Sequence, residues 1–568
     1  MIEIKEGKPR KMPGITSLTV SFPYRKEIVN IVKGSEVSYF DEKKKTWEVP
    51  TTSLAYLVDE LCKYDDIEIT NYKMEKVSYK KESLDLDGIK SNPYDYQIEG
   101  AEFGLSHKKF LLLDVPGLGK TLQIIMMANH LYRQKKIEHC LIVCGVNSLK
   151  FNWKNEIQKH SNLSATILGE RTSRTGKVTI GSLKERVNHL KRKIDEFFVI
   201  TNIETIRSND IVNAIKKNKI NNFDMIVLDE AHAVKSAGAK QSENFLKLKG
   251  VQYAVCATGT MLLNNVTDCH LPMKFIGEDH SSSSIFEHYY CVFDDKFGTR
   301  FLGYRNLDII KEQLSNCSIR RTKDLLNLPE KNVIVEYVEL NEYHKQFYNN
   351  ILNGIVEQVD KVHISTKSLL AMFARLRQAA ELPSILTTDN VPSSKIDRAE
   401  DLIRQIVSNG EKVIVFSSFK EPIYYLAKKI DDLKPSINTG DQKDNEINEN
   451  VNSFQNGADK VFLGTWQKCG TGITLNSASH MIFLSTPYTA GAFDQACDRI
   501  HRIGTKKPVF IYNLICKDTL DEKVLEIITD KKYIADFVID DEISESAMES
   551  LRKYIQDFNV EMRVENKC

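Results

Sequence analysis

The chain has 568 residues, which is too long for a single hydrophobic core and predicts two to four domains. Hydrophobic residues make up 42% of it and charged residues 27%, as in an ordinary globular protein, and no apolar run reaches the roughly 18 residues needed to cross a bilayer. Basic and acidic residues number 78 and 77, so net charge neither indicates nor excludes a nucleic-acid partner, because a local basic stripe is sufficient.

Neither a secretory signal nor a metal-binding cysteine pattern is recognisable. Residues 1–5 contain no apolar core, so we expect an intracellular protein without membrane association. The closest of the eleven cysteines, Cys140 and Cys144, flank and enter an apolar run typical of a strand. We therefore predict reduced core cysteines, with a zinc site as the alternative.

The first part of the chain, residues 1–75, is interpreted as a small mixed module. Residues 38–49 predict two short strands joined by a charged turn, and residues 53–64 predict a helix with one apolar face. The polar and charged stretch 76–92 is interpreted as a linker.

From residue 93 onward, short apolar strands alternate with amphipathic helices, which favours parallel sheets covered by helices. The predicted strands of a first block are 110–113, 141–143, 197–200, 225–228 and 253–257. Those of a second block are 413–416, 460–464, 480–484 and 509–514. Helices and loops are expected between about 265 and 335, and a helical tail at 531–568, whose last helix Ser544 could cap. The two blocks could be one fold used twice.

A glycine-rich loop follows the first strand of the first block. Residues 114–121 have the sequence Asp-Val-Pro-Gly-Leu-Gly-Lys-Thr and precede a helix. Gly117 and Gly119 would let backbone N–H groups approach the phosphates of ATP, Lys120 would reach the β and γ phosphates, and the hydroxyl of Thr121 would hold Mg²⁺. The usual first glycine of such a loop is an aspartate here, so a tight turn with a surface lysine remains the alternative.

An acidic pair follows the strand at 225–228. Open α/β sheets present ligands at the carboxyl ends of their strands, where Asp229 would hold Mg²⁺ and Glu230 would orient and deprotonate the attacking water. Such a pair is common and usually solvated, but here it comes about a hundred residues after a phosphate loop.

These elements resemble the SNF2 (Swi2/Snf2) family of superfamily 2 DNA translocases, over residues 93–525. The family's loop, Asp-Glu-Met-Gly-Leu-Gly-Lys-Thr, also begins with aspartate. The resemblance implies an α/β fold with two RecA-like lobes, at 93–330 with a helical insertion and at 331–530. It also implies a DNA-dependent ATPase with ATP and Mg²⁺ as cofactors.

Further motifs follow in the family's order. Gln97, within Tyr-Gln-Ile-Glu-Gly at 96–100, resembles the glutamine that helps to recognise adenine. Residues 495–504 resemble the motif Gln-Ala-x-x-Arg-x-His-Arg-Ile-Gly-Gln, whose final glutamine is Thr505 here, and Arg499 and Arg502 would be arginine fingers on one face of a helix. Gly472 and Gln495 would also bind the nucleotide. The resemblance assigns DNA contact, or its coupling to ATP, to Trp153, Thr258, Gly259, Thr260, Arg321, Gly470 and Thr471.

The N-terminal module resembles the HARP domain of the annealing-helicase branch. It has Tyr39 and Asp41, a lysine-rich turn at 43–45 and then Trp47, with a helix after them. Thr474 points to the same branch. In that branch the module recognises branched DNA. The alternative is a small β-rich domain whose tryptophan packs into its own core.

We therefore expect a monomeric translocase on double-stranded or branched DNA, acting in fork regression, branch migration or strand annealing, and thus in replication, repair or recombination. Its compact build suggests a bacterial or phage member, located in the cytoplasm or the host-cell cytoplasm, or in the nucleus if eukaryotic. The alternatives are a remodeller of chromatin or other protein–DNA complexes, an RNA or single-strand helicase, and a scaffold that binds ATP without hydrolysing it.

Overall fold

The structure, a computed structural model, describes most of the chain. The described residues are 2–7, 17–35, 38–70, 82–145, 149–172, 178–234, 238–259, 266–279, 281–293, 301–326, 328–361, 366–389, 391–442, 444–469, 473–488, 490–529, 538–539 and 542–543. The contacts within the chain divide it into two units, one of residues 1–115 and 120–321, the other of residues 116–119 and 322–568.

The N-terminal module is a mixed five-stranded sheet with two helices. The strand order is β3-β4-β2-β1-β5, with β5 parallel to β1 and the other neighbours antiparallel. The elements are β1 (Ile2–Gly7), β2 (Ser17–Ser21), α1 (Lys26–Lys33), β3 (Tyr39–Asp41), β4 (Thr46–Pro50), α2 (Leu54–Leu61) and β5 (Ile67–Thr70). The predicted strand pair and helix are confirmed as β3, β4 and α2, whereas β1, β2, β5 and α1 were not predicted.

Lobe 1 is built on a seven-stranded sheet in which every neighbouring pair is parallel. Its strands, in sheet order, are β16 (Ser318–Ile319), β6 (Lys109–Leu112), β13 (Tyr253–Ala257), β12 (Phe223–Asp229), β7 (His139–Cys144), β11 (Phe198–Asn202) and β8 (Ala165–Ile167). Two antiparallel ribbons accompany it: β9 (Glu170–Thr172) with β10 (Val178–Ile180), and β14 (Cys291–Phe293) with β15 (Phe301–Tyr304).

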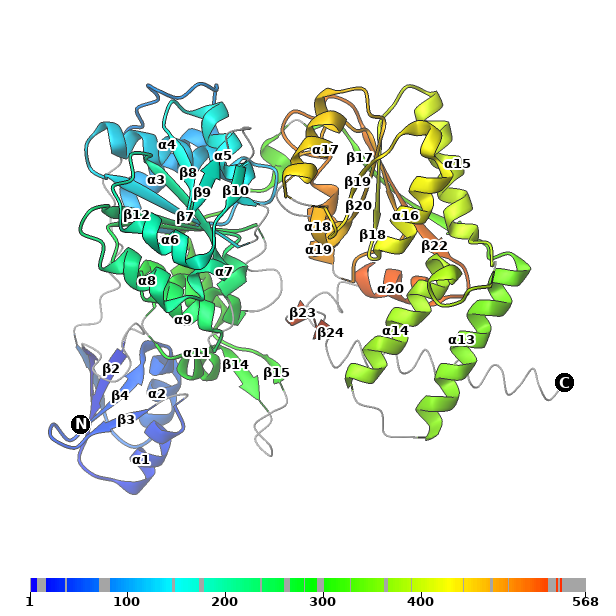
Figure 1. Cartoon of the computed structure of the whole chain (residues 1–568). Coiled ribbons are helices and arrows are strands. Elements are labelled where there is room, and N and C mark those ends of the chain that lie inside the picture. Colours follow the sequence, from blue (N-terminus) through cyan, green and yellow to red (C-terminus); the bar gives the residue numbers. More distant parts are fainter. Residues whose placement is uncertain are drawn as a thin grey trace. The chain divides into compact units, whose positions relative to one another are not determined.

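Helices cover both faces of this sheet (Figure 1). One face packs on α3 (Asp95–His107), α4 (Lys120–Arg133) and α5 (Leu149–His160). The other packs on α6 (Leu183–Leu190), α7 (Ile203–Ile206), α8 (Asn209–Lys216), α9 (Lys240–Leu246), α10 (His270–Ile276), α11 (Ser283–Tyr290) and α12 (Leu307–Cys317). Side chains alternate between the faces along a strand, so that Phe110 and Leu112 enter one core while Leu111 and Leu113 enter the other.

The described part of the predicted linker, residues 82–92, belongs to lobe 1. The Asp85 amide donates to Nδ1 of His130 on α4 at 2.9 Å, and the Asn129 side chain donates to the Asp87 carbonyl at 2.8 Å. Leu84, Leu86 and Ile89 pack on the core beneath α4. This stretch is therefore packed structure rather than a free connection.

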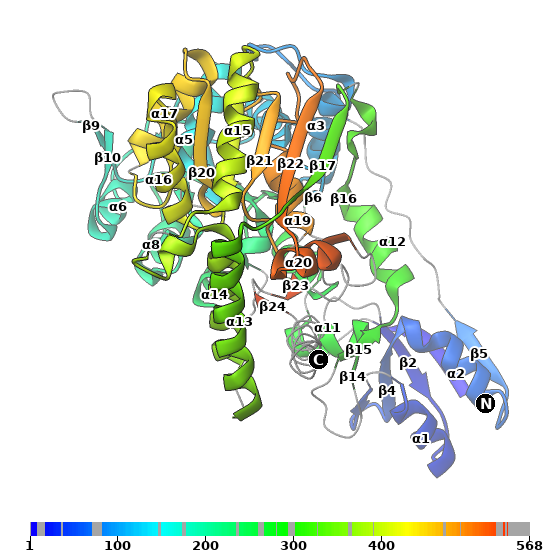
Figure 2. The same cartoon turned by 90° about the vertical axis from the view of Figure 1, so that its right-hand side faces the viewer.

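Lobe 2 repeats the topology of lobe 1. Its parallel strands, in sheet order, are β17 (Lys331–Val338), β22 (Val509–Cys516), β21 (His480–Phe483), β18 (Val413–Ser417), β20 (Val461–Thr465) and β19 (Ser436–Asn438), and Figure 2 shows β17, β22 and β21 side by side. Numbered by chain order within each sheet, and leaving out β16, both lobes have the strand order 1-6-5-2-4-3. The two blocks are one fold used twice, and the prediction of two parallel, helix-covered sheets is confirmed.

The helices of lobe 2 also form two layers. One face of the sheet packs on α13 (Glu342–Lys361), α14 (Thr366–Glu381), α15 (Ser394–Ser408), α16 (Lys420–Lys429) and α20 (Leu520–Thr529). The other packs on α17 (Asp444–Asn456), α18 (Trp466–Cys469) and α19 (Ala490–Cys497).

The tail departs from its helical prediction where it is described. β23 (Val538–Ile539) and β24 (Glu542–Ile543) pair as a short antiparallel hairpin, and the cap predicted at residue 544 lies outside the described residues. Within the described chain, no helix combines the length and the apolar character needed to span a bilayer. Cys140 and Cys144 are free and buried in β7, as predicted.

Candidate active site

The glycine loop joins β6 to α4, as the sequence predicts. Gly117 and Gly119 have φ angles of +93° and +75°, a backbone conformation that residues with a Cβ rarely adopt. The loop ends where Lys120 starts α4, so the first N–H groups of that helix face the loop without partners inside the helix. A phosphate cradle requires this arrangement.

Asp114, the residue in place of the first glycine, is a buried anchor. Its carboxylate accepts from Nε of Arg321 at 3.0 Å and from Nη2 at 2.8 Å, and from the amide of Gln123 at 2.8 Å. Its carbonyl accepts from Nζ of Lys120 at 2.9 Å. The loop is therefore fixed at its first residue by a two-pronged ion pair, the strongest form that an arginine and a carboxylate make.

This geometry bears on the two roles predicted for Arg321, DNA contact or its coupling to ATP. Its side chain is only 9% exposed, and it also donates to the carbonyl of Tyr96 and lies over that ring, 5.4 Å from the centroid. An arginine whose guanidinium is enclosed in this way cannot also bind the DNA backbone. Its bonds to Asp114 at the start of the phosphate loop favour the coupling role.

The acidic pair ends β12, which lies two strands away from β6 with only β13 between them. Glu230 has a φ angle of +56°, an uncommon conformation for a residue with a side chain and one that costs about 1–3 kcal/mol where the surroundings impose it. Gly145, just after β7, allows it: a Cβ there would lie 2.8 Å from the Glu230 carbonyl oxygen and 2.9 Å from its Cβ. Sequence reasoning missed Gly145, which follows the predicted strand 141–143 as an unremarkable glycine.

Trp153 on α5 is bonded to the first of these two carboxylates. Its indole Nε1 donates to Oδ2 of Asp229 at 2.7 Å, and its side chain is buried. A 1% exposed ring has no surface to offer DNA, so of the two predicted roles, DNA contact or its coupling to ATP, the position of Trp153 favours coupling. Burial, and then the charge of Glu230, raise the pKa of Asp229 to about 6, which the Trp153 hydrogen bond and the charge of Lys120 oppose.

The threonine after β13 touches the acidic motif as well. Thr258 is buried, donates its amide to the carbonyl of Leu112 at 3.1 Å, and has its hydroxyl 3.3 Å from Nδ1 of His232. His232 in turn lies 3.4 Å from Oε2 of Glu230. Thr258 is thus linked to Glu230 through one histidine, which suits a residue that couples two parts of the site.

Gln97, expected at the adenine, closes the first turn of α3. Its Oε1 accepts the Tyr94 amide at 3.0 Å, and the side chain is 2% exposed. The adenine contact stays a prediction.

The two arginines of lobe 2 lie beyond the end of α19, in turns, so the prediction that they share a helical face is wrong. Arg499 donates to the carbonyls of Gln495 at 3.1 Å and Ile473 at 3.2 Å, and Arg502 donates to the Thr474 hydroxyl at 2.8 Å. Both are thus tied to the residues that follow the glycine motif at 470–472.

Thr505, where the family has glutamine, closes this turn. Its hydroxyl accepts the Arg502 amide at 3.1 Å and lies 2.6 Å from the Ile500 carbonyl. A small hydroxyl side chain therefore fixes the backbone around Arg502. Four predicted residues lie outside the described part of the chain: Thr260, Gly470, Thr471 and Gly472.

The donor set at the loop and the acidic pair fits Mg²⁺. Each oxygen of Asp229 accepts one hydrogen bond, from the Glu230 amide at 3.1 Å and from Trp153, which leaves a lone pair on each for a metal. Mg²⁺ is usually held by one or two carboxylates, substrate phosphates and water, and Thr121 at the start of α4 adds a hydroxyl. Among the described residues, no cluster of three or more His, Cys, Asp or Glu side chains could enclose a metal by itself.

Comparison with known families decides the assignment. The model of the SNF2-related domain matches residues 53–385, more than half of the chain. The chain belongs to the SNF2 family. The helicase conserved C-terminal domain matches residues 394–504, which include both arginines of lobe 2.

Among curated SNF2 relatives, an ATP-dependent helicase of Mycoplasma pneumoniae is 27% identical over 452 residues, covering 78% of this chain and 41% of its own length. The ISWI chromatin-remodeling complex ATPase ISW1 of Saccharomyces cerevisiae is also 27% identical, over 78% of this chain and 40% of its own. This SNF2 chain therefore spans about two fifths of the length of these relatives. A solved SWI2/SNF2 ATPase core of Sulfolobus solfataricus in complex with dsDNA is 24% identical, with a TM-score of 0.39 over 80% of this chain and 95% of that one.

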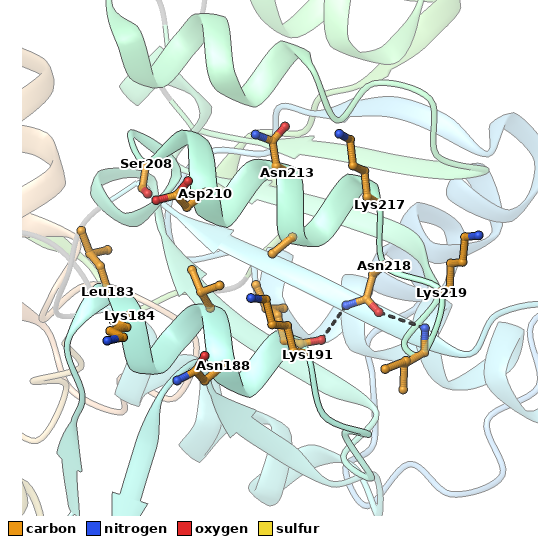
Figure 3. Close-up of a pocket in the computed structure, with 14 residues that line it drawn as sticks. Leu183, Lys184, Asn188, Lys191, Ser208, Asp210, Asn213, Lys217, Asn218 and Lys219 are labelled. Atoms are coloured by element: carbon orange, nitrogen blue, oxygen red, sulfur yellow. Dashed lines mark hydrogen bonds between the residues drawn. The ribbon is translucent and has the colours of Figure 1, made fainter.

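The SNF2 core also carries a lysine-lined hollow in lobe 1 that shares no residue with these motifs. It has a volume of about 900 Å³ and lies between α6 and α8. Figure 3 shows Lys184, Lys191, Lys217 and Lys219 around it, with Asp210 as the one carboxylate in the lining. Asn218 supports it, donating to the Leu190 carbonyl at 2.8 Å. Because the net charge of the whole chain is close to zero, its composition gave no sign of this local basic surface.

Proposed function

We propose that this SNF2 chain is an ATP-dependent translocase on double-stranded DNA that remodels branched DNA. The observation that carries the proposal is the meeting of three motifs at the carboxyl ends of three adjacent parallel strands. The phosphate loop follows β6, Thr258 follows β13, and the pair Asp229–Glu230 ends β12. Open α/β sheets bind their ligands at this edge.

The residues of lobe 1 would divide the chemistry of ATP hydrolysis among them. Lys120 and the loop amides would bind the phosphates, and Thr121 and Asp229 would hold Mg²⁺, which supplies charge neutralisation on the phosphates when bound. Glu230 would align the attacking water and accept its proton. Its carboxylate is 17% exposed, so water reaches it, and His232 at 3.4 Å restricts its orientation.

Lobe 2 would supply the cationic groups that the transferring phosphoryl requires. Arg499 donates to the carbonyls of Gln495 and Ile473, and Arg502 donates to the Thr474 hydroxyl, so both guanidinium groups are held at the residues that follow the glycine motif. Arginines positioned in this way support the arginine-finger role, in which cations stabilise the charge of the γ-phosphoryl.

Two features support a polyanionic partner. The hollow between α6 and α8 carries four lysines against one carboxylate, a local basic surface of the kind that phosphate backbones bind without base contacts. Membership in the SNF2 family favours duplex DNA over RNA as that partner.

The N-terminal module supports the finer proposal of branched DNA. Phe40 on β3 and Trp47 on β4 are a cross-strand pair with ring centroids 5.1 Å apart, and Phe40 is 42% exposed. The ammonium of Lys33 lies 5.9 Å from the Trp47 ring, and the turn 43–45 is preformed, because Asp41 accepts the Lys43 and Lys44 amides. Exposed aromatic rings beside lysines can stack on the unpaired bases that a fork offers and a linear duplex lacks.

The alternative is a tryptophan that only packs into the core of its own module. Trp47 does pack against the apolar core of the module, but it is not enclosed by it. A second candidate function, remodelling of chromatin or of other protein–DNA complexes, is favoured by the name of the ISW1 relative, a chromatin-remodeling ATPase.

Replacing the proposed base separates hydrolysis from binding. Glu230→Gln should lower ATP turnover by about a hundredfold or more while ATP is still bound, because the amide cannot accept the proton. The control is Glu243→Gln, the same change at an exposed position on α9. Unchanged turnover in Glu230→Gln would mean that Glu230 is not the base.

A further inference from the structure

Strand β17 forms one edge of the lobe 2 sheet, beside β22 (Figure 2). Among the described residues no strand pairs with its outer edge, and Val333, Val335 and Tyr337 are 47%, 38% and 51% exposed. An edge strand presents a row of backbone N–H and C=O groups to which another strand can add, and this one is eight residues long and apolar in its middle. It is therefore an interaction surface that requires an occupant.

Lobe 1 shows how an edge of this kind is closed. The strand at the same position in the shared strand order, β6, has its outer edge paired in parallel with β16, and residues 110–112 of β6 are buried. β16 is the one strand of the lobe 1 sheet that the shared order leaves out. In lobe 1 a further strand thus covers the first strand of the repeated fold, whereas in the described part of lobe 2 that place is open.

The hydrogen bonds to β22 show which residues of β17 face outward. The carbonyls of Glu330 and Val338 accept the amides of Val509 and Lys517, at 2.9 and 3.0 Å, so these even-numbered residues face β22. Because backbone groups point to alternate edges along a strand, those of the odd-numbered residues 331–337 point away from β22. Their side chains also share one face of the sheet, opposite to the face of Val338.

Read outward along this edge, the odd-numbered residues are complementary to themselves. They are Lys331, Val333, Val335 and Tyr337, followed by Glu339 just beyond the strand. In an antiparallel pair with Val335 opposite its own copy, Val333 lies opposite Tyr337 and Lys331 lies opposite Glu339. Each of these two pairs occurs twice. Aromatic–branched pairs and opposite charges across two strands are stabilising, whereas like charges are destabilising.

The two end charges stay within reach of such a partner. Lys331 forms an ion pair with Asp494 at 3.2 Å, and Glu339 forms one with Lys517 at 2.6 Å. Solvent reaches both pairs, so they are weak, and an opposite charge from another strand can add to each. No charged side chain interrupts the outward-facing residues between them, although such charges are a usual protection of edge strands.

We propose that β17 pairs antiparallel with β17 of a second copy of this chain, about a two-fold axis at Val335. The six-stranded sheets of the two copies then continue into each other, and each copy closes the open edge of the other. A single strand pair is at the small end of protein–protein interfaces, so we expect a Kd for the dimer in the micromolar range. The inference is independent of the proposed ATPase function, and it opposes the monomer expected from the sequence.

Charge exchange tests the register of this pair. Lys331→Glu and Glu339→Lys each place like charges opposite one another at both ends, and each should raise the dimer Kd by about tenfold. The double variant Lys331→Glu/Glu339→Lys restores both opposite pairs and should return the Kd to within about threefold of wild type. The control is Lys420→Glu, which breaks an exposed ion pair with Asp441 elsewhere on lobe 2 and should leave the Kd unchanged. Sedimentation equilibrium of the full chain up to about 100 µM gives the values.

A disulfide locates the two-fold axis without disturbing the charges. Val335→Cys is made in a chain that also carries Cys62→Ser and Cys568→Ser. Opposite residues of a hydrogen-bonded antiparallel pair have Cα atoms about 5.5 Å apart, within the range of a disulfide, so mild oxidation should link two copies. Ile334→Cys, on the other face and opposite residue 336 in this register, is the control and should not link. A chain that stays monomeric to about 100 µM would overturn the proposal. So would an unchanged Kd in both single charge variants, or equal linking by Ile334→Cys and Val335→Cys.

Discussion

The indole N–H of Trp153 donates to a carboxylate oxygen of Asp229 at 2.7 Å, from a ring that is 1% exposed. Because Asp229 is the carboxylate that would hold Mg²⁺, the tryptophan orients a metal ligand without touching metal or nucleotide. Partners of this kind fix the direction of a ligand's lone pairs, and their loss typically costs ten- to a hundredfold in metal affinity or activity.

Trp153→Phe removes this donor and keeps most of the volume. We expect the Mg²⁺ concentration for half-maximal ATP turnover to rise by about tenfold, with a smaller loss of turnover at saturating Mg²⁺. Mg²⁺ titrations of the ATPase rate measure it. Trp47→Phe, the same change in the N-terminal module, is the control. Equal Mg²⁺ dependence in wild type and Trp153→Phe would mean that the bond has only a packing role.

Gly100→Ala tests how tightly the side chains of Gln123 and Arg321 pack against Gly100. Alanine normally stabilises a helix relative to glycine by about 1 kcal/mol, but here its Cβ would overlap Gln123 and Arg321. We expect a lower thermal unfolding midpoint and a higher KM for ATP. Gly354→Ala on α13, where nothing lies within 4 Å of the added Cβ, should have the opposite sign and raise the midpoint. A stabilised Gly100→Ala variant with a normal KM for ATP would show that the two side chains move aside and make room for the added Cβ.

The exposed aromatic pair of the module predicts a substrate preference. Phe40→Ala should weaken binding to forked DNA by about tenfold and leave linear duplex binding unchanged, since base stacking on an aromatic ring contributes about 1–3 kcal/mol. Tyr24→Ala, at another exposed aromatic of the same module, is the control. Fluorescence anisotropy with both DNAs gives the ratio, and an equal loss on both would deny the module a role in fork recognition.

A buried carboxyl in lobe 2 predicts a pH dependence of stability. Burial raises the pKa of Glu381, at the end of α14, from 4.5 to about 6, although Lys395 and a hydrogen bond from Ser417 act in the other direction. The folded state then binds the proton more tightly than the unfolded chain. The contribution of Glu381 is therefore fully present below about pH 4.5 and is lost, by about 2 kcal/mol, as pH rises through 6.

Glu381→Gln removes this titration. We measure the thermal unfolding midpoints of wild type and variant from pH 4.5 to 7.5. As pH rises through this window, the midpoint of the variant should rise relative to that of the wild type. Glu421→Gln, on the exposed side of α16, should give a constant difference. A constant difference for Glu381→Gln as well would place its folded pKa near the ordinary value.

The sequence was sufficient for the features that local pattern determines. Short apolar strands, the glycine loop between a strand and a helix, and an acidic pair after a strand all have signatures within a few residues, and the structure has each within a few residues of its predicted position. The two-residue strand β16 has no such signature, because only its pairing with β6 defines it.

The spacing of residues in the sequence could not show which of the motif side chains are buried. The resemblance assigned Trp153 and Arg321 to DNA contact or to its coupling to ATP. Their partners, Asp229 and Asp114, are 76 and 207 residues away. Only the folded chain shows that these side chains face inward. The same holds for Gly145, whose role depends on Glu230 across the sheet.

If this chain is a duplex DNA translocase, duplex DNA drives its ATP hydrolysis, and the ATPase rate on different nucleic acids tests this most directly. The steady-state ATPase rate is compared without nucleic acid and with saturating linear duplex, forked duplex, single-stranded DNA and structured RNA, in wild type and in Lys120→Ala. We predict a low basal rate, stimulation of about tenfold or more by duplex DNA and most strongly by the fork, little by RNA, and none in Lys120→Ala. Strongest stimulation by RNA, or an unchanged rate in Lys120→Ala, would contradict it.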